Sequence, residues 1–577
     1  MTNFSEAPGA STSPAELLAV ARGDEPADLV LRGGRLVNVL SGEIQETAVA
    51  IHGGLIAGLG GYEEGRETVD LDHAYLAPSY IEGHMHVETT LLTPHELARA
   101  ACARGTGTLV CDPHEIANVL GVRGIEWMLG AGEGAPAELL YTAPSCVPVS
   151  AMETAGSAIG EAEVAALLED ERVVGLAEVM NFPGAVAGDA GVLGKLGAAK
   201  GYPVDGHAPG LSGRALNAYV AAGPGSEHEA TALEEGREKL RLGMRVMMRE
   251  GTPAKDLRAL LPLVTPSTER RLMMVNDDVS VADLMDRGHL DHHLRLAVAA
   301  GVDPITALRM VTLNVAEWFE LEDRGAIAPG LRADLVVLRD LEGFETLRTY
   351  QAGRLVAREG RCLREYRLPP GLGPTVRVDW DAVDLSLPVH GKRARVIGVV
   401  PGQVLTRALL ETPSAEDGLA VADPSRDLLK LAVVERHTGR STTAVALVRG
   451  LGLERGALAS SVAHDHHNVM LTGTDDADML LAGREVGRLG GGFVVATEGE
   501  VLASVALPIA GLMSPAPFAE VRTRYDRVLE AARSLGCHLD DPFMTLSFLG
   551  LCVIPELKLT DKGLVDVARF ELVSPFV

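Results

Sequence analysis

The sequence predicts an α/β fold: a (β/α)8 TIM-like barrel with a split β-sandwich module and an additional C-terminal α+β domain. The barrel is predicted from eight short apolar runs between residues 76 and 330, each of which ends in polar or ionisable side chains. Helical segments, many of them rich in Ala, separate these runs, among them PHELARAACARG, GRALNAYVAAG and LEEGREKLRLG. Eight strand-then-helix units over about 250 residues match the size of a (β/α)8 barrel.

The segments on either side of the barrel share a different pattern. Residues 1–75 begin with a short predicted helix, SPAELLAVARG, and continue with apolar runs broken by Gly-Gly and Ser-Gly, which is typical of β-hairpins. The hairpin pattern returns over residues 331–375. We therefore assign 1–75 and 331–375 to one β-sandwich module, split around a barrel at 76–330.

A Pro- and charge-containing stretch, YRLPPGLGPTVRVDWDAVDLSLP, is predicted to link the module to a further domain at residues 385–577. Strand-like runs and turns occur in GRLGGGFVVATEGEVLASVALP, and FAEVRTRYDRVLEAARSLG has the spacing of an amphipathic helix. This mixture predicts an α+β domain.

Composition excludes several classes of partner. Apolar residues make up 47% and charged residues 23%, as in ordinary globular proteins, and the formal net charge is −27. Such a charge repels nucleic acid and anionic membranes. The six cysteines include no CxxC pair, which fits a reducing cytoplasm. Neither a signal-peptide pattern nor a run of 18 apolar residues is evident, so we expect no membrane span.

Metal-binding residue types gather where the predicted strands end. In SYIEGHMHVETT, His84 and His86 stand two residues apart, so on a strand both rings face the same side. Barrel active sites lie at the C-terminal ends of the strands. One histidine there is usually a packed group, but a series in strand order predicts a metal site. The other candidates are Asp112, His114, Glu115, Glu178, His207, His228, Glu229, Arg249, Glu250, Asp277 and Asp278.

These residue types suit a particular chemistry. Borderline divalent ions bind imidazole and carboxylate together. Two such ions a few Å apart need an anionic bridge, and water bound to them loses a proton near neutral pH. An aspartate beside that water can accept the proton and pass it to a leaving group.

Longer motifs resemble a known family. The HMH triplet and the later strand-end ligands are similar to the amidohydrolase superfamily. The segments IEGHMHVETTLLTPHELA, DPHEIANV, GLAEVMNFPGAVAGD, VDGHAPGLSGRALNAYVAAG, VAHDHHNVM and PFMTLSFLGLCVIPELKLTDKGLVDV more closely resemble the bacterial adenine deaminase family. The resemblance extends from about residue 20 to the end of the chain.

The resemblance implies hydrolysis of adenine to hypoxanthine and ammonia, a purine salvage reaction, by a bridging hydroxide that attacks C6. It implies two divalent ions, with Mn2+ or Fe2+ expected first and Zn2+ as an alternative. One ion would be held by His84, His86 and a bridging Glu178, and the other by Glu178, His207 and His228. Asp277 would bind the first ion and carry the proton. Asp278 is the second choice, because neighbours on a strand point in opposite directions.

Other assignments are less direct. His228, Asp277 and Glu250 are the expected catalytic residues, with Glu250 as the acid that protonates a ring nitrogen; a salt bridge between Glu250 and Arg249 is an equal alternative. His114 and Glu115 are expected to support the ligands. Glu88 and Ser145 are expected near the barrel mouth.

Two further histidine clusters lie outside the strand ends. The histidines of AHDHHNV (His464, His466 and His467) could form a lid or a second metal site. Those of GHLDHHLR (His289, His292 and His293) are expected to be solvated or to cap a helix.

Two other functions stay open on the sequence. A related amidohydrolase could deaminate a modified purine or hydrolyse a cyclic amide with the same metal site. A catalytically inactive barrel could serve as an assembly scaffold, but such a protein would have no reason to keep every expected ligand. The family also implies a homo-oligomer, with a dimer as the simplest case.

Overall fold

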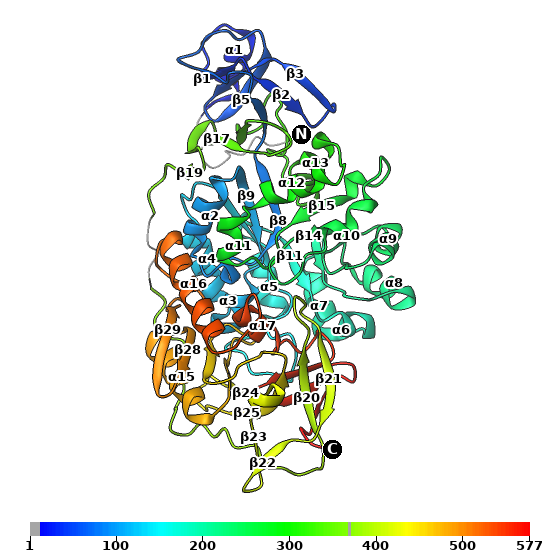
Figure 1. The fold of residues 1–577 in the computed structure, drawn as a ribbon. Coiled ribbons are helices and arrows are strands. Elements are labelled where there is room, and N and C mark those ends of the chain that lie inside the picture. The colour runs from blue at the N-terminus through cyan, green and yellow to red at the C-terminus, as the bar shows by residue number, and fades with distance from the viewer. Residues whose placement is uncertain (1–11, 367–370) are drawn as a thin grey trace.

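A computed structural model describes residues 12–366 and 371–577. Figure 1 shows three layers along the long axis of the molecule: a β-rich end that holds the first strands, a central body of parallel strands and helices, and a second β-rich end that holds the C-terminus. Among the described helices, none has both the length and the apolar character that crossing a membrane requires.

Eight parallel strands form the central body, and each of the eight predicted runs contains one of them. Strands β8 to β12 form a five-stranded sheet and β13 to β15 a three-stranded sheet. Hydrogen bonds also join the two sheets, from Gly225 N to Val204 O at 2.9 Å and from Asp277 N to His84 O at 3.0 Å. The strands are β8 (Tyr80–Met85), β9 (Thr106–Cys111), β10 (Glu138–Ala143), β11 (Val173–Val179), β12 (Val204–Gly206), β13 (Ser226–Glu227), β14 (Arg245–Arg249) and β15 (Leu272–Val275).

Helices connect successive strands of this body, including the three that the sequence predicts at PHELARAACARG, GRALNAYVAAG and LEEGREKLRLG. The first of them begins where the Thr93 side chain accepts a hydrogen bond from Glu96 N, which caps the helix. The helices are α2 (Pro94–Cys102), α3 (His114–Leu120), α4 (Val122–Ala131), α5 (Glu161–Leu167), α6 (Phe182–Ala187), α7 (Ala190–Ala198), α8 (Gly213–Ala222), α9 (Leu233–Arg241), α10 (Leu257–Leu260), α11 (Val281–Asp286), α12 (Leu290–Ala299), α13 (Pro304–Met310) and α14 (Leu313–Trp318).

The β-rich end beside the N-terminal strands takes its strands from both sides of the central body. One sheet has the order β5-β4-β1-β6, and another has the order β19-β18-β17-β16-β7-β2-β3. In the second sheet, β7 pairs antiparallel with β16, so segments about 260 residues apart in sequence lie side by side. The elements are α1 (Pro14–Arg22), β1 (Leu29–Arg32), β2 (Arg35–Asn38), β3 (Glu43–Glu46), β4 (Ala48–His52), β5 (Leu55–Gly60), β6 (Glu67–Asp70), β7 (Tyr75–Pro78), β16 (Leu335–Leu338), β17 (Thr346–Gln351), β18 (Arg354–Arg358) and β19 (Arg361–Cys362).

The C-terminal part has the mixed α and β content that the sequence predicts. Its main sheet has the order β21-β20-β25-β24-β27-β26-β28-β29. In the described part of the stretch between β19 and β20, no helix or strand occurs, as expected of a linker. The elements are β20 (Ala394–Val399), β21 (Thr406–Glu411), β22 (Ser414–Glu416), β23 (Leu419–Val421), β24 (Leu428–Val434), β25 (Thr443–Arg449), β26 (Ala457–Ser460), β27 (Val469–Gly473), α15 (Asp476–Leu489), β28 (Gly492–Thr497), β29 (Glu500–Ala506), α16 (Phe518–Ser534), α17 (Pro542–Phe548), β30 (Leu557–Thr560), β31 (Gly563–Asp566) and β32 (Glu571–Val573).

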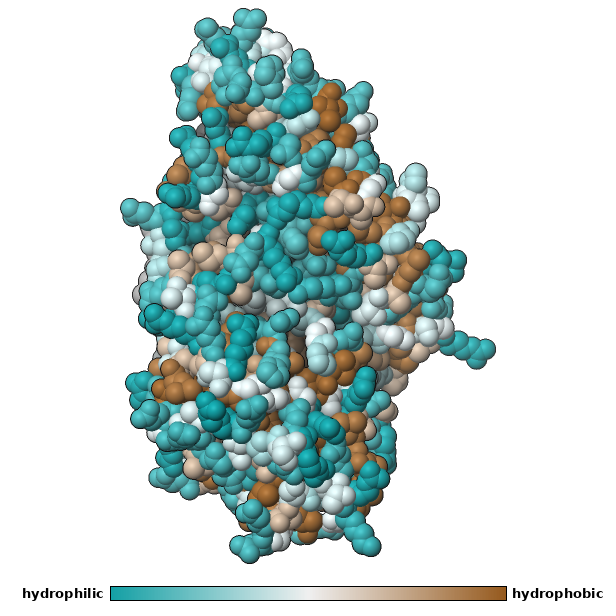
Figure 2. Space-filling view, in the orientation of Figure 1, coloured by the Kyte–Doolittle hydropathy of each residue, from teal (hydrophilic) through white to brown (hydrophobic). Residues whose placement is uncertain are grey.

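The C-terminal part packs directly on the central body. Glu96 of α2 accepts a hydrogen bond from Phe518 N at 2.8 Å, and Thr154 N donates to Asp561 at 2.9 Å. Figure 2 shows that most of the visible surface is polar, with apolar side chains in separate patches. One cluster of buried apolar side chains includes residues of both parts, among them Leu97 of α2 and Val521 of α16.

Glu153 gives this contact a pH dependence. Its carboxylate is buried, accepts a hydrogen bond from Val149 N at 3.2 Å and lies 3.4 Å from the Sγ of Cys552 in the C-terminal part. Burial, and next the charge of Asp465, raise the pKa of Glu153 from its ordinary 4.5 to about 8. Between those two values the folded chain holds a proton that the unfolded chain releases, so the free energy of unfolding falls as pH rises.

We expect Glu153→Gln to remove this pH dependence, because glutamine does not titrate. The urea midpoint of the native protein should fall more steeply between pH 5 and 8 than the midpoint of the variant. Other titrating groups are common to both proteins and cancel in the difference. Parallel curves for the two proteins would contradict the assignment.

Candidate metal centre

The six predicted metal ligands lie together at the C-terminal ends of the central strands. His84 is the penultimate residue of β8 and His86 follows it, Glu178 is the penultimate residue of β11, and His207 and His228 come directly after β12 and β13. The sixth, Asp277, lies two residues after β15, and all six are buried. A cavity of about 30 Å³ lies among most of them, lined also by side chains from the C-terminal part.

Glu178 lies between two pairs of imidazoles. Its Oε2 accepts a hydrogen bond from His207 Nδ1 at 2.5 Å and lies 3.2 Å from His228 Nε2. Its Oε1 faces the other pair, 3.4 Å from His86 Nε2 and 4.0 Å from His84 Nε2. Burial alone would raise the pKa of Glu178, but His207 and His228 hold it well below its ordinary value. One carboxylate thus presents a separate oxygen to each pair, as a bridging ligand must.

Asp277 completes the first group. Its Oδ1 lies 3.5 Å from His84 Nε2 and 3.3 Å from His86 Nε2, and its Oδ2 accepts a hydrogen bond from Arg249 at 3.0 Å. The backbone of Asp277 has a φ of +58°, a left-handed conformation that aspartate tolerates better than most residues. Close by, His293 donates a hydrogen bond from Nε2 to Val275 O at 2.9 Å, which fixes the end of β15.

The reason for ranking Asp278 behind Asp277 was wrong, although the ranking itself stays a prediction. Strand β15 ends at Val275, so the alternation of a strand does not apply to either aspartate. Both carboxylates line the cavity. Burial, and next the charge of Asp277, raise the pKa of Asp278 to about 6. Asp277 differs in its short distances to His84 and His86.

The donor set fits divalent cations. Among the described residues, His84 Nε2, His207 Nε2 and His228 Nδ1 are buried nitrogens without a hydrogen-bond partner. Buried polar atoms normally have partners, so three such atoms in one cluster call for a bound species. Groups within metal-binding reach include His84, His86 and Asp277, and also His84, Glu178 and His228. Imidazole and carboxylate oxygen together suit Mn2+, Fe2+ and Zn2+.

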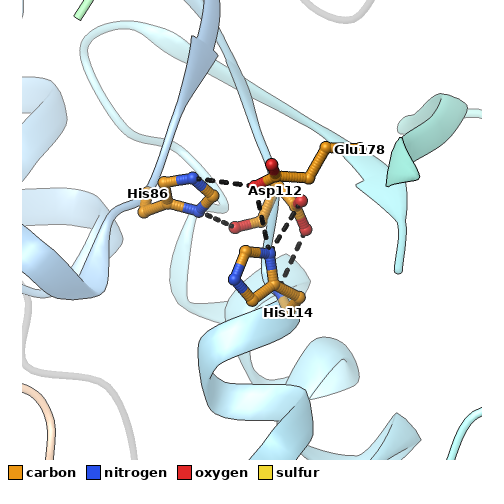
Figure 3. Close-up of side chains that lie close together, drawn as sticks. All are labelled: His86, Asp112, His114 and Glu178. Carbon is orange, nitrogen blue, oxygen red and sulfur yellow. Dashed lines mark hydrogen bonds and ion pairs between the residues drawn. The ribbon is translucent and has the colours of Figure 1, made fainter. Parts of the chain in front are cut away.

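His114 supports the cluster from the start of α3 (Figure 3). Its Nδ1 lies 2.8 Å from Asp112 Oδ2 and 3.7 Å from Glu178 Oε1, while Asp112 O lies 3.2 Å from His86 Nδ1. Asp112 and His114 therefore orient the ring of His86 and the carboxylate of Glu178. The supporting role of His114 stays a prediction, and this placement extends it to Asp112, which was only a candidate on the sequence alone.

The three other residues expected around the ligands make different contacts. Ser145 donates a hydrogen bond to the backbone oxygen of Glu178 at 2.5 Å. Glu88 accepts one from Ile116 N at 3.0 Å, and burial raises its pKa to about 7. Glu115 lines the cavity, as expected near the ligands.

Glu250 does not lie where the sequence suggested. It is half-buried and is not among the residues that line the cavity, and burial raises its pKa. The alternative, a salt bridge with Arg249, is also absent from the ion pairs of the described residues. Arg249 pairs with Glu229, Asp256 and Asp277 instead. Glu229, which the sequence names among the strand-end candidates, does line the cavity.

The C-terminal part contributes side chains that local sequence patterns could not place. His464 and Asp465 line the cavity, together with Phe548. His464 Nδ1 lies 2.5 Å from Glu115 Oε1, and His467 contacts the other oxygen of the same carboxylate. This segment therefore lies at the same cavity as the strand-end residues. Asp465 also lies within metal-binding reach of His114 and Glu115, so the choice between a lid and a second metal site stays a prediction.

A larger cavity, of about 820 Å³, lies next to the metal centre. Three residues, Pro253, Val404 and Phe548, line both cavities and so form the wall between them. The buried Nζ of Lys558 donates a hydrogen bond to Phe548 O at 2.8 Å and another to Val404 O at 2.9 Å. Lys558 therefore holds two parts of this wall together.

The central body is a domain of the amidohydrolase family, whose model matches residues 75–356. Residues 403–571 match the model of an adenine deaminase C-terminal domain. The adenine deaminase of Desulfatibacillum aliphaticivorans is 48% identical over 565 residues, covering 97% of this chain and 99% of that protein. That of Methanothrix thermoacetophila is 44% identical with the same shares. The chain belongs to the adenine deaminase family.

Proposed function

We propose that this protein catalyses the hydrolysis of adenine to hypoxanthine and ammonia. The observation that carries the proposal is the position of Glu178 between two imidazole pairs, with Asp277 beside the first pair. Relatives named adenine deaminase match nearly the whole chain, including the C-terminal part that closes the site. The central body and the C-terminal part both contribute side chains to the cavity, so a match of the whole chain to these relatives supports adenine as the substrate.

The proposed site holds two divalent ions, with Mn2+ or Fe2+ preferred and Zn2+ as the alternative. His84, His86, Asp277 and one oxygen of Glu178 would hold the first, and His207, His228 and the other oxygen would hold the second. When bound, these ions would lower the pKa of a water molecule enough to supply a hydroxide near neutral pH.

The residues of the chain then manage protons and charge. Asp277 would accept the proton of the attacking water and deliver it to the departing exocyclic amine at C6. Arg249 holds the second oxygen of Asp277 at 3.0 Å, so the carboxylate keeps one orientation. The buried walls exclude bulk water, which strengthens these charge interactions. Glu250 as the acid for a ring nitrogen stays a prediction, but its place outside the cavity lining does not favour it.

Architecture, location and assembly belong to the same proposal. The hydrogen bonds between β8 and the residues after β15, and those between β12 and β13, support a closed (β/α)8 barrel at residues 76–330. The pairing of β7 with β16 supports a split β-sandwich over 1–75 and 331–375, and the C-terminal domain would span 385–577. A cytoplasmic location fits six unpaired cysteines. A homodimer is expected from the family alone.

The direct test is an assay of adenine consumption and ammonia release after controlled metal loading. We expect protein stripped with a chelator to be inactive and to regain activity with two equivalents of Mn2+ or Fe2+. Modified purines and cyclic amides, assayed in parallel, should react more slowly than adenine. Fully loaded protein that leaves adenine untouched would overturn the substrate assignment.

A further inference from the structure

We propose that His464, supplied by the C-terminal part, donates a hydrogen bond from Nε2 to N1 of the purine ring. The proposal rests on the proposed function and names a residue that reads the substrate at that same site. His464 is 2% exposed and lines the cavity that also contains Glu178 and Asp277. It thus brings a hydrogen-bonding group from outside the barrel to the reacting ring.

The orientation of the His464 ring is set on two sides. Its Nδ1 lies 2.5 Å from Glu115 Oε1, and a carboxylate can only accept, so Nδ1 carries a hydrogen. Its face stacks on Phe548, with ring centroids 4.4 Å apart and an angle of 24° between the planes. Its Nε2 is buried and has no hydrogen-bond partner among the described residues. Such an atom on a cavity wall calls for a polar partner inside the cavity.

The other unpartnered polar atoms of the cavity are carboxylate oxygens, which favour a protonated His464 with a donor at Nε2. Apart from the imidazoles assigned to the ions, three carboxylate oxygens of the cavity lining also lack hydrogen-bond partners among the described residues: Glu115 Oε1, which has only the ion pair with His464, Asp278 Oδ1 and Asp465 Oδ2. All three are acceptors when ionised. Burial lowers the pKa of His464, but the charges of Glu115 and Asp278 outweigh it and raise that pKa to about 9. The protonated ring then has an N–H at each nitrogen.

The chemistry of the substrate selects N1. Adenine has acceptor nitrogens in its ring, and addition of hydroxide at C6 moves electron density onto the adjacent N1. A donor at N1 is therefore favoured more strongly as the reaction proceeds. The competing donors that line the cavity are committed elsewhere: Arg249 to three carboxylates and His114 Nδ1 to Asp112.

Unreactive analogues allow the contact to be measured without turnover. The experiment compares dissociation constants of Mn2+-loaded protein for 6-methylpurine and for its 1-deaza and 7-deaza counterparts, by calorimetry. Replacing N1 with C–H should weaken binding to the native protein about 10- to 100-fold, since a charged donor loses its acceptor. In His464→Leu, 6-methylpurine and its 1-deaza counterpart should bind equally. His464→Gln, which keeps an N–H near the position of Nε2, should retain part of the preference.

His467→Leu is the matched control. His467 also contacts Glu115, but it does not line the cavity. This variant should keep the preference for 6-methylpurine over the 1-deaza analogue. If His464→Leu raises the dissociation constants of all three analogues by the same factor, the imidazole only packs against the substrate and the proposal is overturned. The proposal is also overturned if, in His464→Leu, replacing N7 with C–H no longer weakens binding while replacing N1 with C–H still does. If native protein binds none of the analogues, the proposed function itself fails.

Discussion

Replacing Glu178 with glutamine is expected to reduce both metal content and deamination. The change removes the negative charge that lies between two imidazole pairs, while the size of the side chain is kept. Without an anionic bridge, two cations would repel each other at close range. We expect kcat/KM to fall by more than about 100-fold, because even outer partners of metal ligands contribute about 10- to 100-fold. Metal analysis after gel filtration should find fewer than two ions per chain.

Glu153→Gln provides the control for this experiment. Glu153 is also a buried glutamate, but it lies at the contact with the C-terminal part and not among the proposed ligands. That variant should keep two ions per chain. A Glu178→Gln protein with full metal content and native kcat/KM would show that this carboxylate does not bridge two ions.

Asp277→Asn is expected to lower kcat by about 10²- to 10⁴-fold, the range typical of losing a group that transfers protons. An amide can still occupy the space beside His84 and His86 and can accept from Arg249, but it cannot take up a proton from water. The loss should persist when metal loading is restored with excess Mn2+. Ammonia release under saturating adenine measures kcat directly.

The neighbouring Asp278→Asn variant separates the two aspartates. Both line the cavity, but the structure gives only Asp277 short distances to His84 and His86. We expect a smaller loss of kcat in Asp278→Asn. A larger loss there than in Asp277→Asn would exchange the two roles.

Local patterns were sufficient to predict that these imidazoles and carboxylates gather, because parallel strands end at one common edge, while their role as metal ligands stays a prediction. His84, Glu178 and His207 are far apart in the chain, but each stands at the end of an apolar run, and packing of the runs side by side brings them together. The same reasoning could not rank Asp278, since it requires knowing that β15 ends at Val275.

Features that depend on packing between parts of the chain could not be predicted in the same way. The position of His464 over the strand ends depends on how the C-terminal part docks, which no local period encodes. Nor did the expected solvated or capping role of His289 and His293 hold for their side chains. Both are buried, and their ring nitrogens bond Thr106 and Val275 respectively. Glu229 lines the cavity and Glu250 does not, and this difference depends on the course of the chain after each strand.

A crystal structure of the Mn2+-loaded protein, with anomalous scattering recorded at the manganese edge, tests the central claim most directly. The account predicts two anomalous peaks, one contacted by His84, His86 and Asp277 and the other by His207 and His228, with one Glu178 oxygen on each. A single peak, or two peaks without Glu178 between them, would contradict it.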